Sequence, residues 1–430
     1  MDATPPPSGL DLAPRRLIRI AAGVICAVAV GLNLALVLAP ATNTPKRWAS
    51  IQKAMQASDW RTVIPALRGW LERDPGDNRA RYQLAIAMRV SGRESEAIAD
   101  LNRMIEGGGP YLAEAANLLG EIYLVRDEAM PALASFRRAV ELAPHEVRQR
   151  NRVISLLSLM ARSSEYRRAA WELQGMNRNP RDLLDLTALD LDVYPEGRNP
   201  EAQLAKYLAR SPADPWLIRA RGLRNLRLGR TNEARTDLDA VADRIIDDPA
   251  GRVGRVECRL VGGITDPEEL DRMLGHPPIG PASDRVAFQR LAARVARVTA
   301  RPDRELAALR DAVATDPRSG AATLELGQAL ERSGETVEAH RWLEQAEPLV
   351  RDRLALETLV RSLYTTRDDP RFAEVARLCE SVGLPREARG WAELALLGEP
   401  NRADMVALLD RLPNPTPEPF DPPKLAATPP

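Results

Sequence analysis

Histidines, cysteines and close pairs of aspartates are the side chains of this chain that could do chemistry. The histidines are His145, His276 and His340, and the cysteines are Cys26, Cys258 and Cys379. They are scattered far apart, and no spacing among them fits a zinc site or a disulfide framework. The pairs Asp190/Asp192 and Asp237/Asp239 stand two residues apart, and side chains at i and i+2 of a helix do not face each other. These residues predict no metal site and no catalytic residues.

Motifs for phosphate binding or nucleophilic catalysis are also absent from the sequence. It contains no Gly-rich loop that ends in Lys-Ser or Lys-Thr, no HExxH, no CxxC and no GxSxG. The run Gly107-Gly108-Gly109-Pro110 has the composition of a turn. We therefore predict that the chain is not an enzyme and needs no cofactor.

The charge balance argues against a nucleic-acid partner. Lys plus Arg is 60 and Asp plus Glu is 60, so the net charge is zero, whereas nucleic-acid binders carry a basic surplus. One local basic stretch contains Arg219, Arg221, Arg224, Arg227 and Arg230. Its spacing could offer a face to an acidic partner, but aspartates follow closely at 237, 239 and 243, and neutralisation by them is the favoured interpretation.

The elements that position these residues follow from an internal repeat. Prolines recur with steps of 35, 34, 36, 32 and 37 residues, at Pro75, Pro110, Pro144, Pro180, Pro212 and Pro249. A period near 34 fits one helix–turn–helix unit per repeat, with the proline at the end of the second helix, which it cannot continue.

One unit shows the pattern most clearly. Large, small and aromatic residues alternate through it in a fixed order: Leu119, Gly120, Tyr123, Ala132, Phe136, Ala139 and Pro144. This spacing resembles the tetratricopeptide repeat (TPR) family, and in particular the bacterial membrane-anchored TPR proteins. The resemblance covers roughly residues 48–400. It implies an all-α, right-handed superhelical solenoid of TPR-like helix pairs, in which Gly120 and Ala132 lie where two helices cross.

The quality of the fit to the repeat pattern divides the chain into predicted segments. Residues 46–249 are predicted to form N-terminal TPR repeats, and residues 285–412 form C-terminal TPR-like repeats. Between them, residues 250–284 fit poorly and read as a degenerate repeat or as a seam between two halves. Residues 354–367 read as a helix that lacks a partner. Eight prolines in the last eighteen residues make 413–430 a proline-rich disordered tail.

The N-terminal residues predict a membrane anchor. Residues 20–39 carry no charge, and twenty residues of helix span about 30 Å, the thickness of the bilayer core. We predict a disordered cytoplasmic arm at 1–17 and a transmembrane signal-anchor helix at 18–40. Three arginines precede this helix and Lys46 and Arg47 follow it, which favours repeats on the extracytoplasmic side of the cytoplasmic membrane. Signal-peptide cleavage after Ala41 is the alternative.

The resemblance also implies where a partner would bind. The first helices of stacked repeats line one face, which can hold a protein segment or a helix. The repeat register places Tyr82, Arg89, Asn117 and Glu121 on that face. We predict a membrane-anchored scaffold or adaptor for protein–protein interactions in the bacterial cell envelope. A self-assembling structural envelope component, and thus a homo-oligomer, is one alternative. A helical accessory subunit of an envelope enzyme complex is the other.

Overall fold

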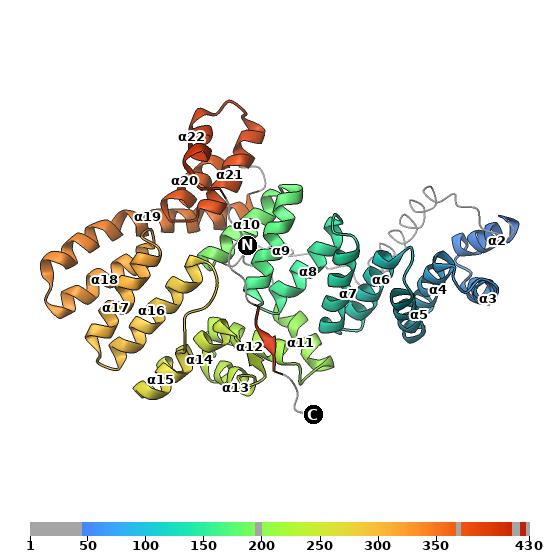
Figure 1. The fold of residues 1–430 in the computed structure, drawn as a ribbon, viewed down its shortest axis with the longest axis horizontal. Helices are drawn as coiled ribbons and strands as arrows, with labels where there is room; N and C mark the ends of the chain where they lie inside the picture. The colour runs from blue at the N-terminus through green and yellow to red at the C-terminus, as the bar shows by residue number, and fades with distance from the viewer. Residues whose placement is uncertain (1–44, 194–199, 367–370, 415–421, 427–430) are drawn as a thin grey trace, which may run out of the picture. The chain divides into compact units, whose positions relative to one another are not determined.

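The computed structural model describes residues 45–193, 200–366, 371–414 and 422–426, and these are helical almost throughout (Figure 1). The chain divides into two compact units, Met1–Leu119 and Gly120–Pro430. The predicted cytoplasmic arm at 1–17 and transmembrane helix at 18–40 lie outside the described residues. Among the helices of the described ranges, none is both long and apolar enough to cross a membrane.

The first unit is a run of helix pairs. Its helices are α2 (Pro45–Gln56), α3 (Trp60–Leu71), α4 (Asn78–Val90), α5 (Glu94–Gly107) and the first part of α6 (Leu112–Val125). Asp77 caps α4, because its Oδ1 accepts a hydrogen bond from the Ala80 amide at 2.9 Å. The other carboxylate oxygen accepts from Trp70 Nε1 at 2.8 Å, so one aspartate starts α4 and joins it to α3.

The second unit contains the rest of α6 and the remaining described helices. They are α7 (Ala129–Leu142), α8 (Val147–Leu159), α9 (Ser163–Asn177), α10 (Pro180–Leu191), α11 (Pro200–Arg210), α12 (Pro215–Arg227), α13 (Thr231–Ala240), α14 (Pro249–Val261), α15 (Pro267–Leu274), α16 (Ala282–Val298), α17 (Pro302–Thr315), α18 (Gly320–Ser333), α19 (Thr336–Thr365), α20 (Phe372–Ser381), α21 (Pro385–Gly398) and α22 (Ala403–Arg411). Helices that are neighbours in sequence pack together along most of this unit. The prediction of an all-α solenoid of helix pairs is confirmed, and the handedness of its superhelix stays a prediction.

The signature residues of the clearest repeat lie on α6, on α7 and in the turn that follows α7. Ala132, Phe136 and Ala139 of α7 are fully buried, and Pro144 follows the end of that helix. A methyl group added at Gly120 of α6 would stand 2.7–2.8 Å from three ring atoms of Phe136. Glycine is therefore required here because the Phe136 ring packs directly on the helix backbone.

Gly120→Ala should destabilise the protein by about 1–3 kcal/mol, because the new methyl group overpacks this contact. Gly175 in α9 is the matched control, since an added Cβ there meets nothing within 4 Å. Gly175→Ala should instead stabilise the protein by about 0.4–1 kcal/mol, because alanine restricts the unfolded chain. Urea unfolding measures both variants. Equal effects of the two substitutions would show that the repeat register is wrong.

The prolines of the repeat have a second role that the sequence pattern did not predict. Two of the six start a helix: Pro180 is the first residue of α10 and Pro249 is the first residue of α14. Proline suits this position because its φ angle is already helical and the first amides of a helix have no internal partner. Residues 250–284, predicted as a degenerate repeat, contain the helix pair α14 and α15.

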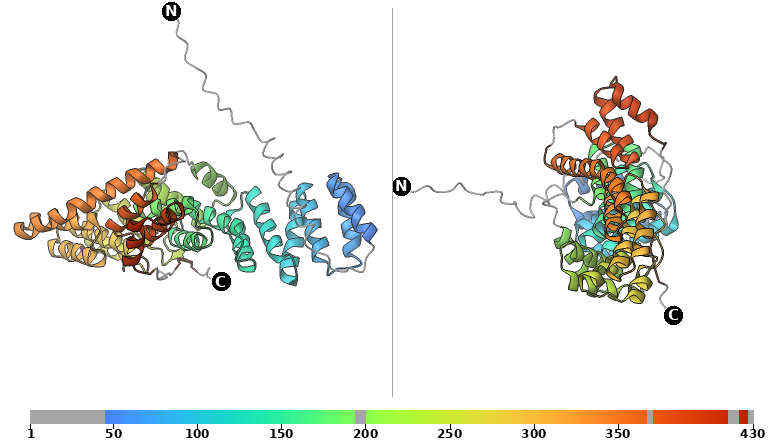
Figure 2. Two further views of the ribbon diagram at one scale, coloured as in Figure 1. Left: turned by 90° about the horizontal axis from the view of Figure 1, so that it is seen from above. Right: turned by 90° about the vertical axis from the view of Figure 1, so that its left-hand side faces the viewer.

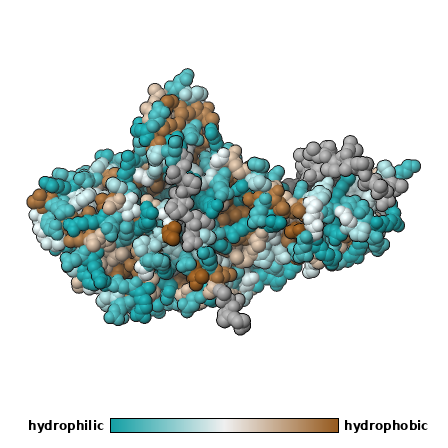
Figure 3. Space-filling model, viewed as in Figure 1, coloured by the Kyte–Doolittle hydropathy of each residue, from teal (hydrophilic) through white to brown (hydrophobic). Residues whose placement is uncertain are grey.

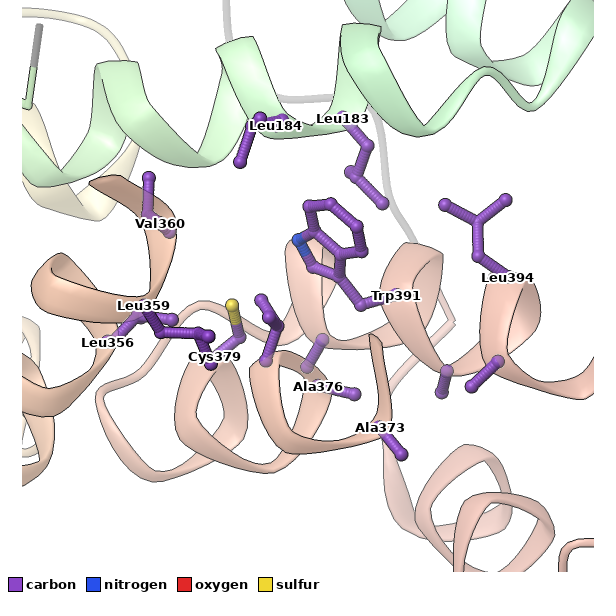
Figure 4. Packing of buried hydrophobic residues seen from close by; sticks show 14 of the residues in the cluster. Leu183, Leu184, Leu356, Leu359, Val360, Ala373, Ala376, Cys379, Trp391 and Leu394 are labelled. Atoms are coloured by element: carbon purple, nitrogen blue, oxygen red, sulfur yellow. The ribbon is translucent and has the colours of Figure 1, made fainter. Parts of the chain in front are cut away.

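Helix α10 packs outside the order of the repeats. It lies against α9, but also against α19 and α21, which follow it by more than 140 residues. We call this contact the α10 seam: Leu183 and Leu184 of α10 with Leu356 and Val360 of α19 and Trp391 of α21 (Figure 4). Trp391 Nε1 donates to Thr187 Oγ1 at 2.9 Å across the seam. In the second unit, α10 therefore packs against helices from the C-terminal part of the same unit, and we call this arrangement closure at the seam.

Helix α19 differs from the sequence-based prediction. A repeat helix and a separate, unpartnered helix at 354–367 were expected, but α19 runs as one helix of 30 residues from Thr336 to Thr365 (Figure 2). Pro348 stands inside it and lacks an amide for the backbone ladder. Buried Leu356, Leu359 and Val360 join the cluster at the α10 seam, so packing compensates for the missing hydrogen bond. The second half of α19 thereby gains the partner that the prediction lacked.

A short sheet joins two distant segments of the second unit. Strand β1 (Ile245–Ile246) follows α13, and strand β2 (Lys424–Leu425) lies in the proline-rich segment 413–430 that is predicted as a disordered tail. The two strands pair antiparallel, with Ile245 opposite Leu425 and Ile246 opposite Lys424. Residues 422–426 of the tail are thus held against the helical body.

Candidate functional site

The predicted partner-binding residues of the first unit occupy the first helices of two neighbouring repeats. Tyr82 and Arg89 lie on α4, and Asn117 lies on α6. We call these three residues the first-helix face. The Tyr82 ring is stacked on Tyr111, with ring centroids 6.0 Å apart and an interplanar angle of 16°. Tyr82 is therefore already half of an aromatic pair that joins α4 to the start of α6.

Arg89 and Asn117 keep hydrogen-bonding capacity that the described residues do not use. Arg89 is partly exposed in the last turn of α4 and makes no ion pair within the described ranges. Asn117 is half-buried, and its Oδ1 atom is buried without a hydrogen-bond partner among the described residues. A buried acceptor without a partner is costly, and a donor from outside could reach this atom only after a rearrangement that exposes it.

The fourth predicted residue, Glu121, has partners of its own in the second unit. Its Oε1 atom lies 3.1 Å from Arg152 Nε, which donates to it, and 4.0 Å from Arg148 Nη2. Both arginines belong to α8, the first helix of the next repeat. Sequence reasoning placed Glu121 on a face but did not pair it with residues about thirty positions later. Its charge is therefore offset within the protein.

Arginines of the basic stretch at 219–230 form ion pairs with carboxylates of the same unit. Arg219 makes a two-pronged contact with Asp248, at 2.5 and 2.7 Å, and both side chains are buried. Arg221 makes a similar contact with Asp237, at 2.8 and 2.7 Å. The favoured interpretation, neutralisation by the aspartates at 237, 239 and 243, is therefore correct for Arg221, whereas the partner of Arg219 is Asp248, which was not predicted. Asp239 likewise accepts hydrogen bonds from Arg255 and Arg259 of α14.

Sequence reasoning missed a cavity of about 680 Å³ in the second unit. Its wall includes residues of α10, α14, α16, α17, α18 and α19, and it is rich in both arginines and carboxylates. Most of these are paired across helices: Arg290 with Glu325, Arg294 with Glu257, and Arg332 with Glu305. The i, i+4, i+7 spacing of Arg290, Arg294 and Arg297 on α16 was the available signal.

At Arg167 in the cavity wall, one guanidinium lies near two carboxylates. Arg167 Nη2 lies 2.8 Å from Asp190 Oδ1, and its Nη1 lies 3.5 Å from Asp284 Oδ2, so two carboxylates share one guanidinium. Burial raises the pKa of Asp284, and the charge of Arg167 only partly offsets this. The wall of the cavity is therefore polar, with charged groups of both signs.

The titratable residues that could act as nucleophiles or metal ligands lie in ordinary structural settings. Burial raises the pKa of the Cys258 and Cys379 thiols, which keeps both neutral. His340 is exposed on α19, 3.1 Å from Glu344, and His276 Nδ1 lies 3.0 Å from Arg252 Nη1. Within the described ranges, no group of three or more His, Cys, Asp and Glu side chains could hold a metal ion.

Comparison with known proteins gives neighbours in structure only. No protein-family model matches the chain, and no curated protein matches it. The complex Cut9–Hcn1 of APC/C is 14% identical over 91% of this chain and 93% of that one, with a TM-score of 0.31. A tetratricopeptide repeat protein from Parabacteroides merdae is 11% identical, covering 66% and 98%, with a TM-score of 0.26. The P58(IPK) TPR domain is 14% identical, covering 78% and 97%, also at 0.26.

Scores this low describe loose superpositions, so the structural assignment rests on the chain's own residues. Its helices pair in sequence order, Gly120 packs on Phe136 at the repeat crossing, and Pro144 follows the second helix. On these grounds the chain is an α-helical repeat protein that resembles the tetratricopeptide repeats.

Proposed function

We propose that this chain is a non-catalytic scaffold that binds a segment of another protein across its first-helix face. The observation that carries the proposal is the pair Arg89 and Asn117, which keep unused hydrogen-bonding groups on adjacent repeats. The partly exposed Arg89 guanidinium makes no ion pair among the described residues and can donate to the backbone carbonyls of an extended segment. Tyr82 contributes a rigid aromatic surface beside them, because Tyr111 already holds its ring.

Site-specific photo-crosslinking in the native host tests this proposal. A photoreactive residue at position 89 should yield an adduct with a distinct protein. The same residue at position 103 is the matched control, because Arg103 is exposed on the second helix α5. Once the partner is known, Arg89→Ala should weaken its binding by about 1–3 kcal/mol. Equal adducts at both positions, or none at position 89, would refute the assignment of the face.

The identity of the adduct separates the alternatives. An adduct with a second copy of the chain would favour the self-assembling structural component. An adduct with a hydrolase or synthase would favour the accessory subunit of an envelope enzyme complex. Any other protein would favour the scaffold or adaptor.

We further propose that residues 18–40 tether this scaffold to the cytoplasmic membrane of a bacterium, with the repeats on the extracytoplasmic side. The support is the uncharged run at 20–39 and the arginines before it. Reporter fusions after Leu412 test the topology: a periplasm-dependent reporter should be active and a cytoplasm-dependent one silent. The reverse result would overturn the orientation, and a mature chain that starts at Thr42 would show cleavage instead of anchoring.

A further inference from the structure

The short sheet of the second unit has the geometry of a peptide bound to a strand edge. β2 comes from a proline-rich segment and adds to β1, which belongs to the helical body (red arrow in Figure 1). Beyond the paired residues, the Ala426 amide donates to the Arg244 carbonyl at 2.8 Å. The contact thus extends over three consecutive positions of each segment. Main-chain pairing of this kind is how proteins bind extended peptides at sheet edges.

The side chains at this edge define what fits it. Ile245 is buried in a small cluster with Trp216 and Val241. Leu425 stands directly opposite Ile245, on the same face of the sheet, and is half exposed. On the other face, exposed Lys424 stands opposite Ile246. The resident segment therefore places an aliphatic residue opposite Ile245 and a basic one opposite Ile246, in an extended conformation.

Two prolines keep the tail extended where it enters the pairing with β1. Pro422 and Pro423 immediately precede β2 and are partly buried. Proline keeps the chain extended before it enters the sheet, which lowers the entropy lost on pairing.

The pairing is short enough to be exchanged. Each strand has two residues, and so small a sheet is marginal by itself. The tail holds its place because it is tethered: eleven residues separate Leu412, after α22, from Lys424. A short tether gives an effective concentration in the millimolar range, which a separate peptide has to exceed.

We propose that the β1 edge is a peptide-binding site, and that the chain's own residues 422–426 are its resident ligand. A partner segment that carries prolines before a basic and an aliphatic residue displaces this ligand and takes its place. The site lies in the second unit and shares no residue with the first-helix face, so it stands or falls separately from the proposed scaffold function.

A binding measurement with a labelled peptide of residues 417–430 tests the site. The peptide should bind a variant that lacks residues 415–430, and its affinity for the full chain should be at least tenfold weaker, because the tail competes. A peptide with Ala426→Pro should lose binding, since proline removes the amide that donates to Arg244. The peptide with Ala426→Ser keeps that amide and is the matched control. Equal binding of the Pro and Ser peptides, or no binding to the shortened chain, would overturn the proposal.

A second measurement uses the full-length chain and does not depend on the deletion. Ile246→Cys with Lys424→Cys places two thiols on directly opposite residues, and the Cα atoms of such antiparallel pairs are about 4.5–5.5 Å apart, within the range that a disulfide bridges. Mild oxidation should give an intrachain crosslink in the double variant and in neither single variant. The crosslinked chain should no longer bind the peptide. Absence of the crosslink, or peptide binding despite it, would show that the tail does not occupy the edge.

Discussion

Trp391→Ala should lower the free energy of unfolding by about 3–5 kcal/mol, the usual cost of removing a buried aromatic side chain. Trp391 is 1% exposed, and its ring fills the space between α21 and α10 at the α10 seam (Figure 4). The substitution leaves a cavity and removes the hydrogen bond to Thr187. Hydrogen exchange measured by mass spectrometry should show faster exchange in α10 and in the second half of α19, whereas α4 and α5 should stay unchanged.

Trp391→Phe is the matched control for this experiment. It keeps an aromatic ring at the seam but cannot donate to Thr187, so we expect a smaller loss, on the order of 1–2 kcal/mol. If Trp391→Ala accelerates exchange in α20 and α21 alone, α10 does not depend on this contact and the second unit is not closed at the seam.

Arg219→Met should cost about 3–5 kcal/mol, because it leaves the Asp248 carboxylate buried without its counter-charge. The side chains of Arg219 and Asp248 are 3% and 9% exposed, and Arg219 Nη1 also donates to the Ala161 carbonyl at 3.0 Å. This one guanidinium therefore joins α12 to the start of α14 and to the turn before α9. Urea unfolding followed by circular dichroism measures the loss.

The same helix offers the control. Arg221 makes an equivalent two-pronged contact with Asp237, but its side chain is 48% exposed, so Arg221→Met should cost only about 1 kcal/mol. Replacing both partners, as Arg219→Met with Asp248→Leu, should restore most of the lost stability, because no unpaired charge then remains buried. Equal costs for Arg219→Met and Arg221→Met would show that burial does not set the strength of these pairs.

The local parts of the fold could be predicted from the sequence because they depend on residues close together in the chain. The contact of Gly120 with Phe136 spans sixteen positions, and a repeating pattern of small and large residues encodes it. The placement of Tyr82 and Arg89 on a first helix follows from the same register. Apolar spacing and helix ends suffice for such predictions.

The α10 seam could not be predicted, because no period connects Leu183 with Trp391. In the sequence, α10 looks like the first helix of an ordinary repeat, and only the structure shows that Leu183, Leu184 and Ala188 are buried in one cluster with residues of α19 and α21. The ion pairs of the candidate site could not be predicted for the same reason. Glu121 was correctly assigned to a first helix, but its partners Arg148 and Arg152 depend on how two repeats stack.

The surface view illustrates why composition alone gives little guidance to a binding site. Polar residues cover most of the visible side, and apolar residues show mainly as small groups between them (Figure 3). Exposed apolar residues are scattered over several helices, as with Val90, Val261 and Leu354. Scattered residues of this kind are normal on protein surfaces and do not define an interface.

Closure at the α10 seam also changes how the second unit is expected to fold. In an open repeat array each unit contacts only its neighbours, so the ends fray first and folding spreads from any stable repeat. The hydrogen bond from Trp391 to Thr187 joins residues 204 positions apart, and forming it costs the entropy of closing the chain between them. Such distant contacts raise the contact order and slow folding. The same contacts link α10 to α21, so these two helices should unfold in one cooperative step and not repeat by repeat.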